Sequence, residues 1–411
     1  MGDSVLREPH RGHRFIMNVE WVMKISKLCN LRCTYCYEFP FLAEKDRMSL
    51  VDLKRMFGHI ADFYAPAPKR MDFVWHGGEP LLIEPDYYKR ILELQHETFD
   101  PVNVPFTNSI QTNLTILNDE ILKLFKSLFR NIGVSLDLFG DQRVTIAGRP
   151  SQKVVLKNIQ RLIDEQIPFG CITVLSRATA PYVEEIYHFF ENIQKSFRLL
   201  PIYRTGYKGQ QDTLALTDAE IVTAFKQAVD LWLMSDSNIK VQPIEDYIKN
   251  VVWYLHGAER RNYYGKEEVV YIVNTDGSLF SDTDTPYPEF CHGNIFRDTL
   301  ASLKRSAGYL NAVNTASQRM KDVCSQCQYY GICSGYDMVD ATREERYRGL
   351  DGRLKCGVAK PVQEYIESVL IDSRAFDPKR RRSSFKQIRA KALNHDASES
   401  ARSRSVATAR G

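Results

Sequence analysis

Strand-like apolar runs alternate with helical patterns six times between Trp21 and Ser235. The expected strands lie near residues 22–26, 73–76, 106–111, 132–136, 169–174 and 198–202. Strands that alternate with helical segments in this way predict repeated βα units and a parallel sheet. Because a closed barrel of this type needs eight units, six units predict an α/β fold with an open, partial (β/α)6 barrel.

Two of the helices carry clear start signals. The first is marked by helical spacing and by Ser49 and Asp52 as a cap, ahead of Leu50, Leu53, Phe57 and Ile60. The sixth is expected to begin at the capping-box sequence Thr217 to Glu220.

Polar motifs follow the expected strands, at or just past their C-terminal ends. They are the cysteine-rich segment 29–36, residues 77–80, Gln111 to Asn113, Ser135 with Asp137, and Thr173. Parallel α/β folds bind ligands at this edge of the sheet. We therefore expect five distant segments to converge on one site. Taken singly, the glycines also fit a plain turn, and Ser135 or Thr173 an ordinary strand end.

The first polar motif contains three closely spaced cysteines. Cys29, Cys33 and Cys36 form a C-x3-C-x2-C pattern with the aromatic Tyr35 before the last cysteine. A four-iron cluster normally takes four cysteine ligands, so three cysteines leave one iron open to a small molecule. The alternatives are a partial zinc site, which would need a fourth ligand, or buried free thiols. The spacing and the aromatic residue resemble those of the radical S-adenosylmethionine (SAM) enzymes, in which SAM chelates the open iron.

The resemblance extends along the barrel, over about residues 17 to 235. Gly77-Gly78-Glu79-Pro80 is similar to the GGEP segment of radical SAM enzymes, whose backbone hydrogen-bonds the amino group of SAM. Glycine suits a backbone that a ligand approaches closely. The resemblance implies that polar residues at the ends of the third to fifth strands contact the carboxylate and ribose of SAM; by position these are Gln111, Asn113, Ser135 and Thr173.

One segment resembles the peptide-modifying branch of the family in particular. It runs from Ser135 through Asp137 to Arg143, with Gly148 and Asn158 beyond, although Leu138-Phe139 replaces the usual glycine after the aspartate.

A second cysteine set stands near the C-terminus. Cys324, Cys327, Cys333 and Cys356 resemble the SPASM domain, which carries auxiliary iron–sulfur clusters in peptide-modifying radical SAM enzymes. A four-thiolate zinc ribbon is the alternative. The resemblance implies one complete auxiliary four-iron cluster on these four residues.

The full SPASM pattern has seven cysteines, and three are missing here. Asp282 and Asp337 stand at two of the missing positions, and no cysteine occurs between Cys171 and Cys291. The second auxiliary cluster is therefore expected to be absent, or held by Asp282, Asp337 and Cys291, although carboxylates suit such clusters poorly. If it is absent, Asp282 or Asp337 is a candidate general base near the substrate; alternatively, both are surface residues.

The resemblance implies an enzyme that forms a 5′-deoxyadenosyl radical and modifies a ribosomally made precursor peptide. A crosslink, either a cyclophane or a thioether, is the favoured product. An anaerobic sulfatase-type maturase that oxidises Cys or Ser to formylglycine is the enzymatic alternative. A non-catalytic zinc or iron–sulfur regulator that binds nucleic acid is the alternative of another class. The expected partners are the peptide and a flavodoxin or ferredoxin reductant. The peptide is expected to dock on the barrel, on the bridging region near residues 242–268, or on a separate leader-binding protein.

Length and composition set the expected domains. The 411 residues, 44% of them hydrophobic, predict an N-terminal extension (1–16), the barrel (17–235), a bridging and SPASM-like α+β region (236–371) and a basic tail (372–411). The tail holds 11 Lys or Arg against 3 Asp or Glu from residue 374 onward. Its composition predicts disorder, and a solubilising role is favoured over nucleic-acid binding.

No apolar run is long enough for a membrane span, and the charged N-terminus is unlike a secretory signal. Nine cysteines grouped in sets fit metal binding in a reducing compartment. The cytoplasm is therefore the expected location.

Overall fold

The computed structural model describes residues 18–202, 209–260, 270–281, 287–335, 338 and 347–372. Asp282, Asp337 and the tail from residue 373 onward lie outside the described residues. In the part of the chain that is described, no helix has the length and apolar character needed to cross a membrane.

One ten-stranded sheet organises the fold. Its order is β10-β9-β8-β1-β2-β3-β4-β5-β6-β7, and β1 to β7 are parallel, with β8 parallel to β1 and antiparallel to β9. The strands are β1 (Asn18–Ser26), β2 (Arg70–Gly77), β3 (Phe106–Thr112), β4 (Asn131–Ser135), β5 (Gly170–Leu175), β6 (Phe197–Pro201), β7 (Val241–Gln242), β8 (Val270–Val273), β9 (Ser278–Ser281) and β10 (Gly293–Asn294). The six expected strands are thus confirmed as β1 to β6.

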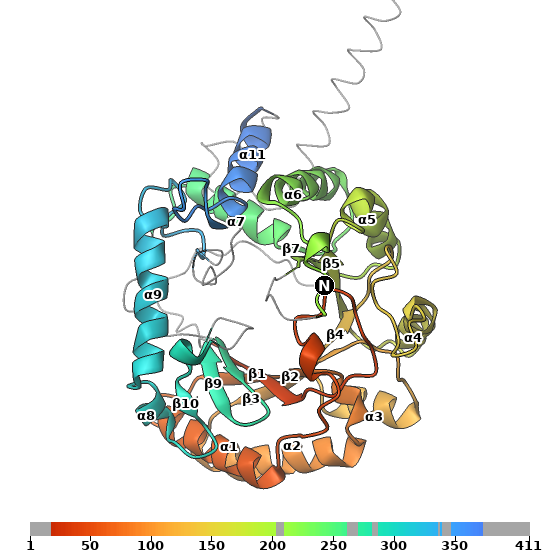
Figure 1. Cartoon of the computed structure of the whole chain (residues 1–411), viewed down its shortest axis with the longest axis vertical. Helices are drawn as coiled ribbons and strands as arrows, with labels where there is room; N and C mark the ends of the chain where they lie inside the picture. The colour runs from red at the N-terminus through yellow and green to blue at the C-terminus, as the bar shows by residue number, and fades with distance from the viewer. Residues whose placement is uncertain are drawn as a thin grey trace, which may run out of the picture.

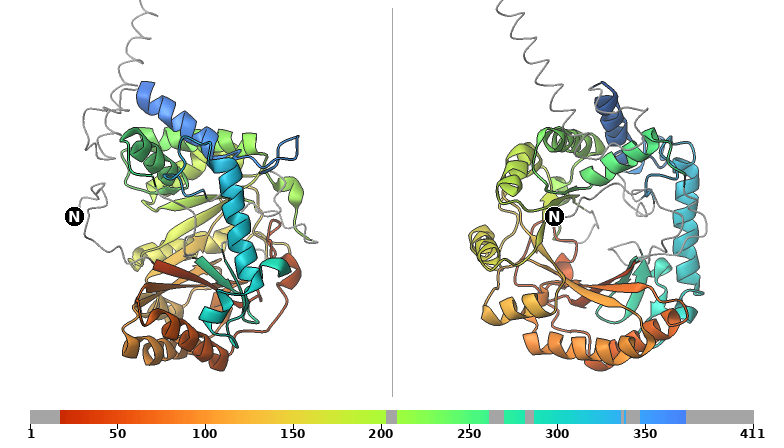
Figure 2. Two further views of the ribbon diagram at one scale, coloured as in Figure 1. Left: turned by 90° about the vertical axis from the view of Figure 1, so that its left-hand side faces the viewer. Right: turned by 180° about the vertical axis from the view of Figure 1, so that it is seen from behind.

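Helices cover the outside of the curved sheet, as Figure 1 shows. Those of the six units are α1 (Leu50–Tyr64), α2 (Pro85–Phe99), α3 (Asp119–Ser127), α4 (Gln152–Asp164), α5 (Val183–Asn192) and α6 (Asp218–Met234). The later ones are α7 (Ile244–Leu255), α8 (Leu300–Leu303), α9 (Ala307–Cys324) and α11 (Ala359–Asp372). In Figures 1 and 2, α9 runs from the β9–β10 side to the α7–α11 side, opposite α4 and α5.

Period-two alternation in β1 explains how the sheet acquires an outer and an inner face. Val19, Trp21 and Met23 are buried in the main core, whereas Glu20 between them is exposed. Both predicted helix starts are confirmed: Ser49 accepts from the Asp52 amide, and Thr217 with Glu220 forms a complete capping box.

The sheet continues beyond the sixth unit in both directions. The hairpin β8–β9 adds to β1, where Trp21 stacks on Tyr271 at 4.6 Å between ring centroids. The hairpin turns at Gly277, whose φ of 87° favours glycine. The expected boundary between residues 235 and 236 therefore lies within one continuous sheet.

Candidate active site

The C-terminal ends of the strands surround a cavity of about 260 Å³. Among the residues that line it are Cys29, Cys33, Tyr35, Cys36, Gly77, Gly78, Gln111, Asn113 and Ser135. The expected convergence of distant segments is therefore confirmed for the cysteine loop and for the ends of β2, β3 and β4.

The cysteine loop is held by the Arg32 side chain and by backbone hydrogen bonds to neighbouring segments. The Cys29 amide donates to the Leu42 carbonyl at 3.1 Å, and the Arg32 guanidinium donates to the Cys29 and Leu31 carbonyls at 2.8 and 2.7 Å. Burial raises the pKa of the Cys29 thiol to about 11 and that of Cys36 to about 12, and it raises the pKa of Cys33 as well. Since metals bind thiolates, a cluster must displace protons from these groups when it binds.

The paired glycines after β2 allow a close backbone approach. The Gly78 amide donates to the Ser26 carbonyl at 2.8 Å, and a Cβ at Gly78 would lie 2.2 Å from the Leu28 carbonyl oxygen. Gly77 has a φ of 128°. From the sequence, these glycines were explained by the close approach of a ligand. The structure shows that the backbone of residues 26–28, which leads into the cysteine loop, already leaves no room for a Cβ at either position.

Glu79 ties the β2 loop to the end of β3. Its buried carboxylate accepts from the Leu81 amide at 2.9 Å, the Thr112 hydroxyl at 2.7 Å and the Asn113 amide at 2.6 Å. Burial raises the pKa of Glu79, and these hydrogen bonds oppose the rise. Neither Glu79 nor the following Pro80, whose carbonyl accepts from the Tyr88 hydroxyl at 2.9 Å, is among the lining residues. They shape the site from behind.

Asn113 and Gln111 supply polar groups to the cavity wall. The side-chain nitrogen Nδ2 of Asn113 donates to the Asn30 side-chain oxygen at 2.9 Å and lies 3.8 Å from the Cys29 sulfur. The Gln111 amide donates to the Ser135 hydroxyl at 2.9 Å. A Cβ at Gly133 would lie 2.0 Å from the Gln111 side-chain oxygen, so this glycine makes room for Gln111.

A buried network supports the cavity from the side of β4. The Tyr35 hydroxyl donates to Asp137 at 2.6 Å and accepts from Arg143 at 2.7 Å. Asp137 also accepts from the Val174 amide at 2.8 Å. Burial raises the pKa of Asp137, with Arg143 opposing the rise. Arg143 itself lines the cavity, and among the described residues its Nε finds no hydrogen-bond partner.

Thr173 differs from the other predicted residues. Its side chain is fully buried and donates to the Leu136 carbonyl at 2.7 Å, and its neighbour Val174 lines the cavity instead. Successive residues of a strand point to opposite faces. A contact between the Thr173 side chain and a ligand in this cavity therefore has no support in the structure.

A buried ion pair lies beside the cysteine loop. Lys24 of β1 contacts Glu38 with 2.6 Å between Nζ and Oε1, and the side chains are 1% and 8% exposed. Lys24 also lies 4.9 Å from the Tyr37 ring centroid. Tyr37 and Glu38 both line the cavity, so the pair holds the exit of the loop against the sheet.

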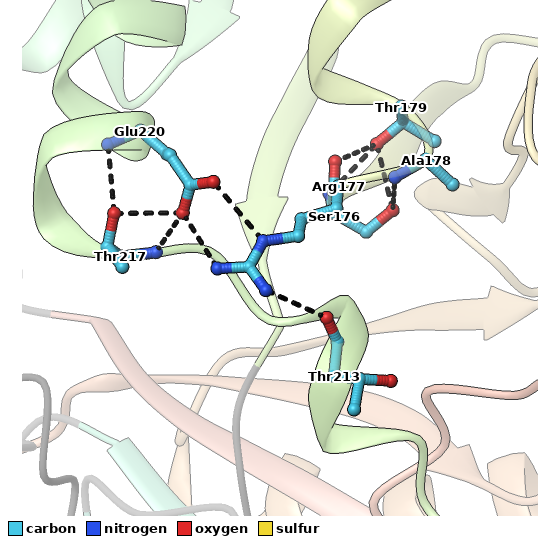
Figure 3. A network of polar contacts seen from close by, with 7 residues as sticks. All are labelled: Ser176, Arg177, Ala178, Thr179, Thr213, Thr217 and Glu220. Carbon is cyan, nitrogen blue, oxygen red and sulfur yellow. Dashed lines mark hydrogen bonds and ion pairs between the residues drawn. The ribbon is translucent and has the colours of Figure 1, made fainter.

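Residues 210 and 211 contact the backbone of the cysteine loop. The Gln211 amide donates to the Thr34 carbonyl at 2.8 Å, and the Gln210 side chain to the Tyr35 carbonyl at 3.0 Å. Figure 3 shows how the segment is anchored: Arg177 makes two contacts with Glu220 at 3.2 Å and one with the Thr213 carbonyl at 3.2 Å.

A second cavity, of about 450 Å³, adjoins the first. Cys324, Cys327, Cys333 and Cys356 all line it, so the C-terminal set does converge. Arg198, Pro243 and Tyr247 line both cavities. Four thiols around one cavity suit a four-iron cluster as a donor set. Among described residues, no three His, Cys, Asp or Glu side chains gather closely enough to share a single ion.

Sequence reasoning missed the shared wall. Arg198 belongs to an expected strand, and period-two alternation from the buried Phe197 and Leu199 identifies it as inward-facing. Tyr247 lies on α7, outside the repeated units, and no local pattern singles it out. The candidate bases Asp282 and Asp337 lie outside the described residues.

Comparison with known proteins agrees with this geometry. Residues 23–190 match the radical SAM superfamily. The serine-type anaerobic sulfatase-maturating enzyme of Klebsiella aerogenes is 33% identical over 76% of this chain and 77% of its own length. The cysteine-type enzyme of Clostridium novyi is 24% identical over 75% of this chain and 84% of its own.

A solved structure supports the fold. Native anSMEcpe with bound AdoMet and Cp18Cys peptide covers 86% of this chain and 97% of its own, with a TM-score of 0.68 and 19% identity. At that identity, the likeness bears on the fold alone. Together with the sequence matches and the converging cysteines, it leads to one conclusion: the chain belongs to the radical SAM superfamily, in the branch that includes the anaerobic sulfatase-maturating enzymes.

Proposed function

We propose that this enzyme modifies a side chain of a peptide or protein, in a chamber between two iron–sulfur clusters. One observation carries the proposal: the two cysteine sets line two cavities that share a wall. In this proposal Cys29, Cys33 and Cys36 hold the SAM-site cluster, and the four C-terminal cysteines hold one auxiliary cluster.

The bound groups supply the radical chemistry. Bound to Cys29, Cys33 and Cys36, a four-iron cluster would supply the electron for reductive cleavage of SAM, and a cluster on the C-terminal cysteines would supply an acceptor for an electron from the substrate.

The chain's own residues hold and shield the reactants. Asn113, fixed by Glu79, lies next to Cys29, and Gln111 with Ser135 presents polar groups on the same wall. Leu200, Ile202 and other apolar residues line the opposite side. Such a wall limits the access of water to a radical.

The product that we favour is an oxidised Cys or Ser side chain. Relatives named as cysteine-type and serine-type sulfatase-maturating enzymes match over three quarters of the chain. The sequence alone favoured a crosslink, with oxidation of Cys or Ser to formylglycine as the enzymatic alternative.

A peptide crosslink is the second candidate. It is favoured by the cysteine count, since only four cysteines remain in the C-terminal set and Asp282 and Asp337 replace two others. A ferredoxin or flavodoxin reductant and a separate leader-binding protein belong to the proposal as partners.

The test begins with anaerobic reconstitution and measurement of iron and acid-labile sulfide. We expect about 8 irons per chain, since each four-iron cluster contributes ~4. Cys36→Ala is expected to abolish reductive cleavage of SAM to 5′-deoxyadenosine, whereas Cys171→Ala, which removes a core cysteine outside both sets, should retain it. Bound zinc with no SAM cleavage would favour the non-catalytic alternative.

Peptide products then separate the two candidates. Oxidation of Cys or Ser yields an aldehyde that a hydrazide probe captures. A crosslink yields no aldehyde, and the joined residues do not separate on fragmentation in the mass spectrometer. If wild-type enzyme cleaves SAM but changes no Cys- or Ser-containing peptide, the proposed substrate class is wrong.

A further inference from the structure

Arg198 projects from β6 into the interior of the barrel. Its neighbours Phe197 and Leu199 are buried in the main core, whereas Arg198 and Leu200 are exposed. Arg198 and Leu200 line the first cavity, and so does part of Leu199. The period of two along a strand accounts for this division. Arg198 therefore lies on the inner face of the sheet.

Arg198 lines both cavities. A group bound near it would lie between the cysteine loop and the C-terminal cysteines, next to Tyr247 and Pro243. A substrate that occupies both cavities would therefore lie beside this side chain.

The other cations of the two cavity walls already have acidic or phenolic partners. Arg143 donates to Tyr35, Lys355 lies 3.0 Å from Asp218, and Lys360 lies 3.7 Å from Glu364.

Arg198 makes no hydrogen bond or ion pair with any described residue. Its acidic neighbour Glu20 interacts with it electrostatically, but the two are not in contact, and Asp72 also acts on Glu20. Arg198 thus offers donors that the fold itself does not use.

We infer that Arg198 binds a carboxylate of the substrate peptide and thereby positions the peptide across the two cavities. This inference rests on the proposed function. A guanidinium matches a carboxylate in a bidentate fork, and such hydrogen bonds are stronger than neutral ones. The carboxylate comes from an Asp or Glu side chain or from the C-terminus of the peptide.

Peptide binding by the reconstituted enzyme with SAM tests the inference, measured by fluorescence anisotropy. The probes are short labelled peptides with one Cys that differ only in an Asp, Asn or Lys near it, each with a free or an amidated C-terminus. We expect at least about tenfold tighter binding when the carboxylate is present, since a hydrogen bond to a charged group contributes ~1.5–3 kcal/mol.

Two variants of Arg198 and a matched control show whether the preference for a carboxylate depends on this residue. Arg198→Gln should remove the preference, and Arg198→Lys should keep part of it. Arg90→Gln, the same change at an exposed arginine of α2 that pairs with Glu93, should keep all of it. Thermal unfolding shows whether each variant is folded.

The outcomes are distinct. If Asp→Asn weakens binding, the carboxylate is a side chain; if only amidation does, it is the C-terminus. If neither change affects wild-type binding, if no peptide binds, or if Arg198→Gln keeps the preference, the inference is wrong. Modification of the same peptides, followed by mass spectrometry, tests the proposed function separately: a carboxylate preference without any product would overturn that proposal and leave this inference standing.

Discussion

Replacement of Lys24 by Met tests how strongly the cysteine loop depends on its buried ion pair. At 2.6 Å, the attraction between the two charges is about 6 kcal/mol for an effective dielectric constant of ~20. Desolvation costs several kcal/mol per ion and offsets most of this gain. The complete pair therefore contributes little net stability, but Glu38 without Lys24 is a buried carboxylate that has lost its cation.

We expect Lys24→Met to lower the free energy of unfolding by about 3–5 kcal/mol. The double variant Lys24→Met/Glu38→Gln should lose much less, because the Glu38 carboxylate is then no longer buried without its cation. Lys126→Met removes an exposed ion pair, in which the side chains of Lys126 and Glu165 are 52% and 41% exposed, and it should cost less than about 1 kcal/mol.

Denaturant unfolding of the cluster-free protein, followed by circular dichroism and tryptophan fluorescence, measures these differences. Iron loss to a chelator from the reconstituted protein provides a second readout, and the single variant should lose iron faster than the double variant. If Lys24→Met costs no more than Lys126→Met, or if the double variant costs the sum of its single changes, the ion-pair argument is wrong.

Three further predictions concern other polar contacts. Glu79→Ala leaves the buried Asn113 amide and two other donors without their acceptor, so it should cost more than about 3 kcal/mol and weaken SAM binding, measured by calorimetry; unchanged binding would contradict its positioning role. Thr217→Ala removes the cap of α6 and should cost ~1 kcal/mol in denaturant unfolding, whereas Thr217→Ser should be nearly neutral. Burial lowers the pKa of His292 from 6.5 to about 4, so below pH 6.5 the unfolded chain takes up a proton that the folded chain does not. Stability from this residue should therefore fall by up to about 3 kcal/mol as pH drops from 6.5 to 4; His292→Leu should flatten that part of the pH profile, and an unchanged slope would refute the assignment.

Local sequence patterns determined the repeated units and the main ligand set. Alternating strands and helices, a serine cap and a capping box depend on residues a few positions apart, and all reappear in the structure. The cysteine triplet is equally local, because one short loop carries all three thiols. Convergence at the strand ends follows from parallel topology alone.

Only the tertiary structure decided which side chains face the ligand and which support it. The Thr173 hydroxyl bonds the Leu136 carbonyl and the Glu79 carboxylate bonds Thr112, and neither residue lines the first cavity. Their positions depend on neighbouring strands that come from elsewhere in the chain. The Lys24–Glu38 pair joins a strand to a loop. The shared wall of Arg198 and Tyr247 exists because residues of β6 and α7, distant in the chain, border the same two cavities. Such contacts between distant segments have no local spacing that reveals them, whereas the cysteine loop carries its chemistry within eight consecutive residues.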